Sequence, residues 1–337
     1  MTTHHDRPEG AEAEWFRSRW RDVIAPRPLV ALGCMNFGKR TPEKDALRIV
    51  DRAFERGVTF FDTANAYVDG QSETILGKAL KGRRDRAIVS SKVGMARVSG
   101  RPEGLSRRAI ESAIDSSLAR LGTDWLDVYY LHVPDHGTPV EESLDAMGRL
   151  VESGKVKRVG ISNYATWETL EMIGRSATVG TPRPVIAQQL YNPILRELDV
   201  EWFSFARKYD VHTSVYNPLA GGLLARGPVD DLHVDVPKGS RFDGNVMYQK
   251  RYWSEPMMRL AGRLQAIARE ASTSLVALSY GFVASTKGVD SILVGPGTVA
   301  HLDDALDALD KPLDATLRAR VDAAYVEHVG TNTHYVR

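Results

Sequence analysis

The chain has 337 residues, of which 43% are hydrophobic and 26% charged, and this composition is typical of a globular protein with a large core. Lys and Arg total 44 and Asp and Glu total 43, so the charge balance excludes the basic surface typical of nucleic-acid-binding proteins. The single cysteine, Cys34, excludes an intrachain disulfide framework and a cysteine-based zinc site.

The N-terminal region is polar, and no run in the sequence reaches the apolar length of a membrane span. We therefore expect a cytoplasmic protein without membrane or nucleic-acid partners. Residues 1–25 are expected to form an N-terminal extension and residues 26–337 a single domain. Within the extension, Trp15, Phe16 and Trp20 interrupt a charged run, which predicts an amphipathic helix that packs on the domain or on a partner subunit.

Beyond this extension, short β-branched or aromatic runs alternate with longer helical patterns. Strands are expected at residues 29–32, 59–62, 87–91, 125–132, 156–161, 185–188, 212–216 and 291–294. Helices are expected at residues 43–56, 106–121, 140–152, 167–173, 200–208, 257–270, 273–283 and 299–309. Gly57, Gly122 and Gly154 stand where helices should end. This alternation allows a closed barrel or an open doubly wound sheet.

The position of the ionisable residues favours the barrel. Asp62, Lys92 and His132 terminate three successive apolar strands, and Tyr67 lies on the loop after the first of them. A (β/α)8 TIM barrel gathers such residues at the C-terminal face of its strands, where enzymes of this fold have their active sites. We therefore expect the active site at that face.

The four residue types also fit one chemistry. A free tyrosine has a pKa near 10, and a nearby ammonium group lowers that pKa. A carboxylate keeps the ammonium charged, and a histidine can orient a carbonyl group. Each residue alone has a structural interpretation, as a turn residue, a solvated charge, a hydrogen-bonded histidine or a packed ring. Together they suit protonation of a carbonyl oxygen during hydride transfer.

The order Asp62, Tyr67, Lys92, His132 resembles the catalytic tetrad of the aldo-keto reductase superfamily, and the match covers the chain from about residue 29. Residues 31–38 resemble the family's opening strand and loop, and residues 160–164 its nicotinamide-amide loop. The strings at 69–77, 131–139, 217–224, 251–253 and 334–337 are similar to those of the aflatoxin-aldehyde and succinic-semialdehyde reductase branch.

This resemblance implies NADPH-dependent reduction of aldehydes or ketones to alcohols. Tyr67 would donate the proton, Lys92 paired with Asp62 would depress its pKa, and His132 would orient the substrate. The resemblance also implies that Ser162, Asn163 and Gln188 hold the nicotinamide carboxamide, that Tyr216 stacks on its ring, and that residues 217–227 wrap the pyrophosphate. The expected cofactor contacts are Met35, Asp62, Ser162, Asn163, Gln188, Tyr216, Asn217, Leu219, Gly221, Leu224, Arg241, Gly295, Gly297, Thr298, His301 and Asp304.

Gly295 and Gly297 belong to a G-x-G-x-x-A string that could suggest a Rossmann fold. No later strand carries the ribose-binding acid, so the string is better interpreted as the phosphate loop after the eighth barrel strand. The residues at Gly297, His301 and Ala305 differ from those usual in the family. Arg241 matches a cofactor arginine of the branch and suits a 2′-phosphate, which favours NADP, with NAD as the alternative.

For the substrate, the branch implies Tyr67, His132, Tyr248, Arg251 and Arg337. The two arginines could bind a carboxylate such as that of a four-carbon semialdehyde. Arg251 could instead be a surface charge or a dimer contact, and the branch implies a homodimer.

The sequence leaves three alternatives to this function. One is an NAD(P)-dependent sugar or alcohol dehydrogenase, or a keto-sugar reductase of a biosynthetic pathway. Another is an NADP-binding regulatory subunit like the potassium-channel β-subunits, which share this barrel. A metal-dependent hydrolase is disfavoured because His132 and His136 lack a carboxylate cluster, so no metal is expected. The physiological carbonyl compound stays open.

Overall fold

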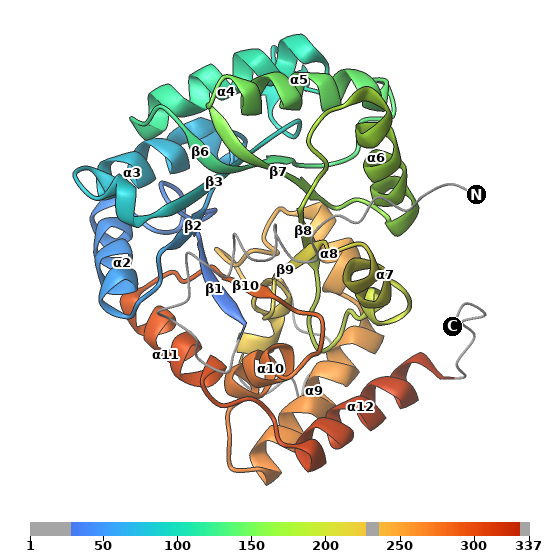
Figure 1. The fold of residues 1–337 in the computed structure, drawn as a ribbon. Helices are drawn as coiled ribbons and strands as arrows, with labels where there is room; N and C mark the ends of the chain where they lie inside the picture. Colours follow the sequence, from blue (N-terminus) through green and yellow to red (C-terminus); the bar gives the residue numbers. More distant parts are fainter. Residues whose placement is uncertain (1–27, 227–235, 331–337) are drawn as a thin grey trace, which may run out of the picture.

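The computed structural model describes residues 28–226 and 236–330 (Figure 1). Its centre is a closed barrel of eight parallel strands in the order β1-β10-β9-β8-β7-β6-β3-β2. The strands are β1 (Leu29–Gly33), β2 (Phe60–Asp62), β3 (Ile88–Val93), β6 (Leu126–Leu131), β7 (Val156–Ser162), β8 (Ile186–Leu190), β9 (His212–Tyr216) and β10 (Ser291–Val294). The barrel closes where β1 pairs with β10, with Ala31 opposite Leu293. The predicted (β/α)8 barrel is therefore confirmed, and no strand end differs from its predicted position by more than two residues.

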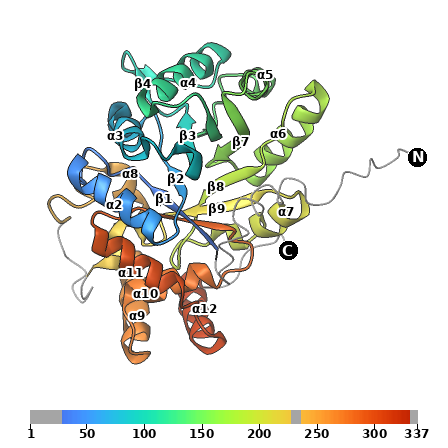
Figure 2. The same cartoon turned by 60° about the vertical axis from the view of Figure 1, so that its left-hand side comes forward.

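Helices form an outer ring around the barrel (Figures 1 and 2). They are α2 (Glu43–Glu55), α3 (Gln71–Leu80), α4 (Arg107–Leu121), α5 (Val140–Glu152), α6 (Thr166–Val179), α7 (Trp202–Lys208), α9 (Glu255–Glu270), α10 (Leu275–Ala284), α11 (Val299–Leu309) and α12 (Ala315–Val329). A further helix, α8 (Val246–Tyr252), lies in the segment between β9 and α9 and is not part of this ring. Local chemistry sets the helix ends: the Ser106 side chain accepts the Ala109 N–H at the start of α4, and Gly122, with φ of 63°, ends it.

The structure extends or adds several helices. The helix predicted at 167–173 runs on to Val179, because Gly174 does not interrupt it and Gly180 supplies the left-handed end. The predicted helices do not include α3, α8 or α12. In α12 the buried residues are only Val321 and Ala324, so its apolar periodicity is weak.

Two apolar layers hold the barrel together. One lies between strands and helices, and the other fills the barrel interior with residues such as Phe60, Val128, Tyr130 and Ile186. Tyr130 packs directly on the backbone of Gly160, where a Cβ would lie 2.5 Å from the ring. The interior is a packed core rather than a pore. A ligand would therefore have to bind outside it, at the ends of the strands.

Some predictions fall outside the part of the chain that the structure describes. They are the extension at residues 1–25 with its amphipathic helix, and Arg337. Among the described residues, no helix is long and apolar enough to cross a membrane.

Candidate active site

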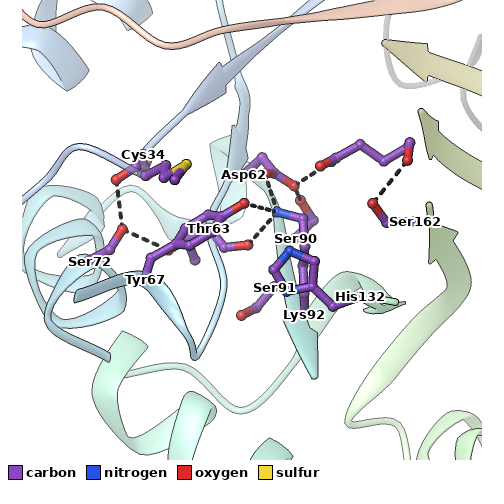
Figure 3. Close-up of polar contacts among 12 residues, drawn as sticks. Cys34, Asp62, Thr63, Tyr67, Ser72, Ser90, Ser91, Lys92, His132 and Ser162 are labelled. Atoms are coloured by element: carbon purple, nitrogen blue, oxygen red, sulfur yellow. Dashed lines mark hydrogen bonds and ion pairs between the residues drawn. The ribbon is translucent and has the colours of Figure 1, made fainter. Parts of the chain in front are cut away.

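Four ionisable side chains meet at the C-terminal end of the barrel. Asp62 is the last residue of β2, Lys92 lies near the end of β3, and His132 directly follows β6. Tyr67 begins a short 3-10 turn, Tyr67–Gly70, after β2. The parallel strands bring these residues together although 70 positions separate the first from the last in the sequence (Figure 3).

Lys92 lies at the centre of this group. Its Nζ forms an ion pair with Asp62 Oδ1, donates to the Thr63 carbonyl at 2.8 Å, and lies 3.2 Å from the hydroxyl oxygen of Tyr67 (Figure 3). The other carboxylate oxygen of Asp62 accepts from Ser90 Oγ at 2.7 Å and from Gln188 Nε2 at 3.0 Å. Lys92 and Asp62 are fully buried. A buried ion pair needs this full set of partners, because each charge has lost its water.

The environment fixes the protonation of the group. Burial raises the pKa of Tyr67, and the opposing effect of Lys92 does not cancel it. Lys92 lowers the pKa of Tyr67, in the direction expected from the sequence, but burial raises it by more. Burial lowers the pKa of Lys92, yet Asp62 and Tyr67 raise it above its usual value. Burial and Lys92 hold the pKa of His132 well below its usual value, so its ring is neutral at neutral pH.

His132 stands beside the tyrosine. The two rings are 5.8 Å apart in an edge-to-face arrangement, with an interplanar angle of 80°. The His132 backbone oxygen accepts the Asn163 side-chain amide at 2.9 Å, which ties the histidine to the loop after β7. Asn163 Oδ1 in turn accepts from the Tyr216 hydroxyl at 2.6 Å. This chain of contacts places a neutral imidazole, with one N–H donor, next to the phenol.

A cavity of about 600 Å³ opens above this group. Seventeen of the predicted site residues line it: Met35, Asp62, Tyr67, His132, Ser162, Asn163, Gln188, Tyr216, Asn217, Leu219, Gly221, Arg241, Tyr248, Arg251, Gly295, Gly297 and His301. Lys92 lies beneath it, in contact with Tyr67.

Three predicted cofactor residues are placed elsewhere. Leu224 is fully buried in the apolar core. Thr298 caps α11 by accepting the His301 N–H, and Asp304 is exposed on that helix. None of the three lines the cavity.

The structure also adds residues that the sequence analysis missed. Asn36, Arg40, Met95, Val133, Met247 and Tyr280 are among the further lining residues. The Arg40 guanidinium donates to the Ser240 carbonyl at 2.9 Å, and Arg241 donates to Asn36 Oδ1 at 2.9 Å. Burial and the neighbouring Arg241 lower the pKa of Arg40. Its position in the loop after the first strand, at the active-site face, is the signal that could have identified it.

The lining suits a phosphate-containing cofactor. Among the described residues, Arg40 and Arg241 have no carboxylate within ion-pair distance, so two guanidinium groups face the cavity without a fixed counter-charge. A Cβ at Gly222 would meet nothing within 4 Å, and one at Gly295 would meet only the Gly33 carbonyl at 3.8 Å. Bare backbone beside two arginines that have no carboxylate partner in the described part of the chain leaves room for a pyrophosphate to approach closely. The residues present therefore fit a dinucleotide.

Comparison with known proteins agrees with this geometry. Residues 29–326 match the model of the aldo/keto reductase family. The chain is 34% identical to aflatoxin B1 aldehyde reductase member 2 of Homo sapiens over 306 residues, which cover 86% of this chain and 84% of that protein. It is 32% identical to the human aldo-keto reductase family 7 member A3, over 87% of this chain and 92% of that protein.

A relative with a different description is also similar. The probable voltage-gated potassium channel subunit beta of Arabidopsis thaliana is 28% identical over 282 residues, which cover 82% of this chain and 85% of that protein. The family match spans the whole barrel, from β1 into α12. The chain therefore belongs to the aldo/keto reductase family of oxidoreductases.

Proposed function

We propose that the protein reduces aldehydes or ketones to alcohols with NADPH, and that Tyr67 donates the proton. The observation that carries this proposal is the position of the Tyr67 hydroxyl, 3.2 Å from the ammonium of a buried Asp62–Lys92 pair at the wall of the cavity. A phenol whose pKa is raised keeps its proton at neutral pH, as a proton donor requires. NADPH, when bound, supplies a hydride.

The other side chains of the site would orient the substrate, stabilise charge and bind the cofactor. The Tyr67 hydroxyl and the neutral His132 ring orient the carbonyl oxygen of the substrate. As negative charge develops on that oxygen, Tyr67 transfers its proton to it, and the Lys92 ammonium stabilises the phenolate that is left. Asp62 holds Lys92 in place. Ser162, Asn163 and Gln188 are proposed to bind the nicotinamide carboxamide, and Tyr216 to stack on its ring.

The first experiment follows NADPH absorbance with a panel of aldehydes that includes succinic semialdehyde and 4-nitrobenzaldehyde. The wild-type protein should oxidise NADPH, and Tyr67→Phe should lose kcat by about 10²-fold to 10⁴-fold. Binding of NADPH, measured by fluorescence quenching, should be unchanged in the variant. Retained turnover in Tyr67→Phe would remove the tyrosine from the proposed mechanism.

The preference for NADP over NAD rests on Arg241, with Arg40 as a second candidate. Both guanidinium groups line the same cavity, and Arg241 is additionally held by the Tyr248 hydroxyl at 3.2 Å. Arginine suits a 2′-phosphate because its planar donors match the phosphate oxygens. Equal kinetic efficiency with NADPH and NADH would contradict this part of the proposal.

A carboxylate-bearing substrate is the finer proposal. Arg251 lines the cavity and lies over the Tyr248 ring, 5.9 Å from its centroid. Burial raises the pKa of Tyr216 to about 12, with Arg251 acting against this rise from nearby. Its location supports a role inside the pocket. Arg251→Ala should raise the KM for succinic semialdehyde by about 10-fold and leave that for 4-nitrobenzaldehyde unchanged. The second proposed arginine, Arg337, lies outside the described residues and needs its own variant.

A regulatory NADP-binding subunit is the second candidate function, because relatives described as potassium channel β-subunits are similar to this chain. Tight NADPH binding without turnover of any aldehyde would favour it. Turnover of alcohols or sugars with NADP⁺ would instead favour a dehydrogenase, since the same four residues serve both directions.

The buried, free Cys34 suits a reducing, cytoplasmic location. The homodimer implied by the branch can be tested by light scattering.

A further inference from the structure

The turn that carries Tyr67 has an unusual backbone. Three consecutive residues after it are left-handed: Val68 (φ 51°, ψ 47°), Asp69 (φ 51°, ψ 41°) and Gly70 (φ 85°). Glycine adopts this conformation freely and aspartate tolerates it, but a β-branched valine strongly disfavours it. The local sequence alone would not maintain this turn, so contacts at its two ends must hold it.

The N-terminal side of the turn is fixed to the barrel. The Thr63 N–H donates to the Ser90 carbonyl at 3.0 Å, in continuation of the β2–β3 pairing. The Asn65 side chain donates to Glu103 Oε1 at 2.8 Å. The chain that leads to Tyr67 is therefore held from two directions.

The C-terminal side is fixed by two residues in the first turn of α3, Ser72 and Glu73, which are both fully buried. Ser72 Oγ donates to the Cys34 carbonyl at 2.8 Å (Figure 3). Glu73 Oε1 accepts from Ser91 Oγ at 2.5 Å, and its Oε2 accepts from Arg120 Nε at 2.6 Å. Glu73 is a buried carboxylate that the mechanism above does not use.

Arg120 connects this carboxylate to the strained turn. A Cβ on Gly70 would lie 2.6 Å from Arg120 Nε, so the guanidinium packs directly on the Gly70 backbone. Ser91, the other partner of Glu73, directly precedes Lys92 in β3. Glu73 thus links the end of the turn, the arginine that covers it and the strand that carries the lysine.

We propose that Glu73 is a positioning residue: by holding Arg120 against the turn and bonding Ser91, it keeps residues 68–70 left-handed and so keeps the Tyr67 hydroxyl within reach of Lys92. Without this clamp, Val68 would relax to a favoured backbone region and carry the adjacent tyrosine with it. This inference rests on the proposed role of Tyr67 as the proton donor.

The test begins with Glu73→Gln, which removes the charge that holds Arg120. We expect kcat for 4-nitrobenzaldehyde reduction to fall by about 10-fold or more, while KM and the Kd for NADPH stay within about two-fold, because only the proton donor moves. Glu43→Gln is the matched control, since it removes an exposed ion pair between Glu43 of α2 and Lys78 of α3, the helix that also carries Glu73. That variant should keep the wild-type kcat.

The decisive measurement is a rescue. Asparagine tolerates the left-handed conformation, so Val68→Asn should remove the need for the clamp. The single variant should have near wild-type kcat, and Glu73→Gln combined with Val68→Asn should recover most of the lost activity. If Glu73 only stabilises α3, the double variant will be as slow as Glu73→Gln, and the inference is wrong.

A second variant covers the case in which Glu73→Gln does not fold, as judged by thermal unfolding. Arg120→Lys keeps the positive charge but loses the planar contact over Gly70, and it should show the same fall in kcat and the same rescue by Val68→Asn. Absence of any reductase activity in the wild-type protein would contradict the proposed function itself. Normal wild-type activity, with loss in Tyr67→Phe but no rescue, would overturn only the role of Glu73.

Discussion

The two ends of the barrel each bury a carboxylate in an ion pair, but the pairs differ in what surrounds them. At the C-terminal end, Asp62 pairs with the fully buried Lys92. At the N-terminal end, Asp127 near the start of β6 is equally buried and pairs with Arg84 at 2.9 Å and Lys157 at 3.1 Å. Burial and pairing alone therefore do not distinguish the proposed active site from the opposite end.

The difference lies in the remaining partners. Arg84 and Lys157 lie over the Trp125 ring, with their charged groups 4.5 Å and 5.0 Å from its centroid, and Asp127 also accepts the Val89 N–H. None of these partners lines the cavity. At the other end, Lys92 also contacts Tyr67, a phenol that lines the cavity. A buried ion pair becomes a candidate for catalysis when it adjoins a proton donor that a ligand can reach.

The largest effect should come from Lys92→Met, which removes the buried cation. We expect kcat to fall by about 10³-fold or more, since the phenolate loses its stabilising charge. Stability should fall by about 3–5 kcal/mol, because Asp62 is left buried without its partner. Lys157→Met is the matched control at the other end. Its kcat should stay within about two-fold of the wild-type value, because Lys157 does not line the cavity. Steady-state kinetics measure kcat, and urea unfolding measures the free energy of unfolding. Comparable loss of activity in the two variants would contradict the distinction between the ends.

Asp127→Asn should separate stability from catalysis. The substitution weakens the contacts with Arg84 and Lys157, so the free energy of unfolding should fall by about 3 kcal/mol. The folded protein should keep its kcat, because this pair does not reach the cavity. Urea unfolding gives the first quantity, and assays well below the unfolding midpoint give the second. A large fall in kcat without destabilisation would show that the N-terminal pair acts on the site.

Particular residues show which parts of the fold and of the site can be predicted from the sequence. Asp62, Lys92 and His132 were identifiable because strand ends can be read from apolar runs, and parallel strands bring such ends together. Arg40 and Glu73 were missed because their partners, Ser240 and Arg120, are distant in the sequence and the contacts depend on loop geometry. The sequence predicts that Lys92 lowers the pKa of Tyr67, but it does not reveal the burial that raises this pKa by more.

At the cofactor end of the cavity, Arg241→Ala and Arg40→Ala should each raise the Kd for NADPH by about 10-fold, since each would lose one charge-assisted hydrogen bond. The Kd for NADH should change by less than about two-fold if the lost partner is the 2′-phosphate. Lys39→Ala removes an exposed charge from the same loop as Arg40, away from the cavity lining, and serves as the control. Fluorescence titration measures all four proteins. Equal weakening of both nucleotides by Arg241→Ala would place the arginine on a shared phosphate instead.

The smallest effect concerns pH. Burial holds the pKa of Tyr67 above 10, Asp62 and Tyr67 keep that of Lys92 above its usual value, and burial with Lys92 keeps that of His132 well below 6.5. A group with a raised pKa keeps its proton as the pH rises, and a histidine with a lowered pKa stays neutral as the pH falls. All three groups therefore keep one protonation state from about pH 7 to 9, and kcat/KM for reduction should vary by less than about two-fold there.

Alcohol oxidation should respond differently, because Tyr67 must then accept a proton. Its rate should rise continuously across the same range, since only the small phenolate fraction is active. Parallel pH profiles in the two directions test this contrast. A break near pH 6.5 in the reduction profile that His132→Asn abolishes would mean that water reaches the histidine. The difference between the two ends of the barrel would then lie in solvent access as much as in the proton donor.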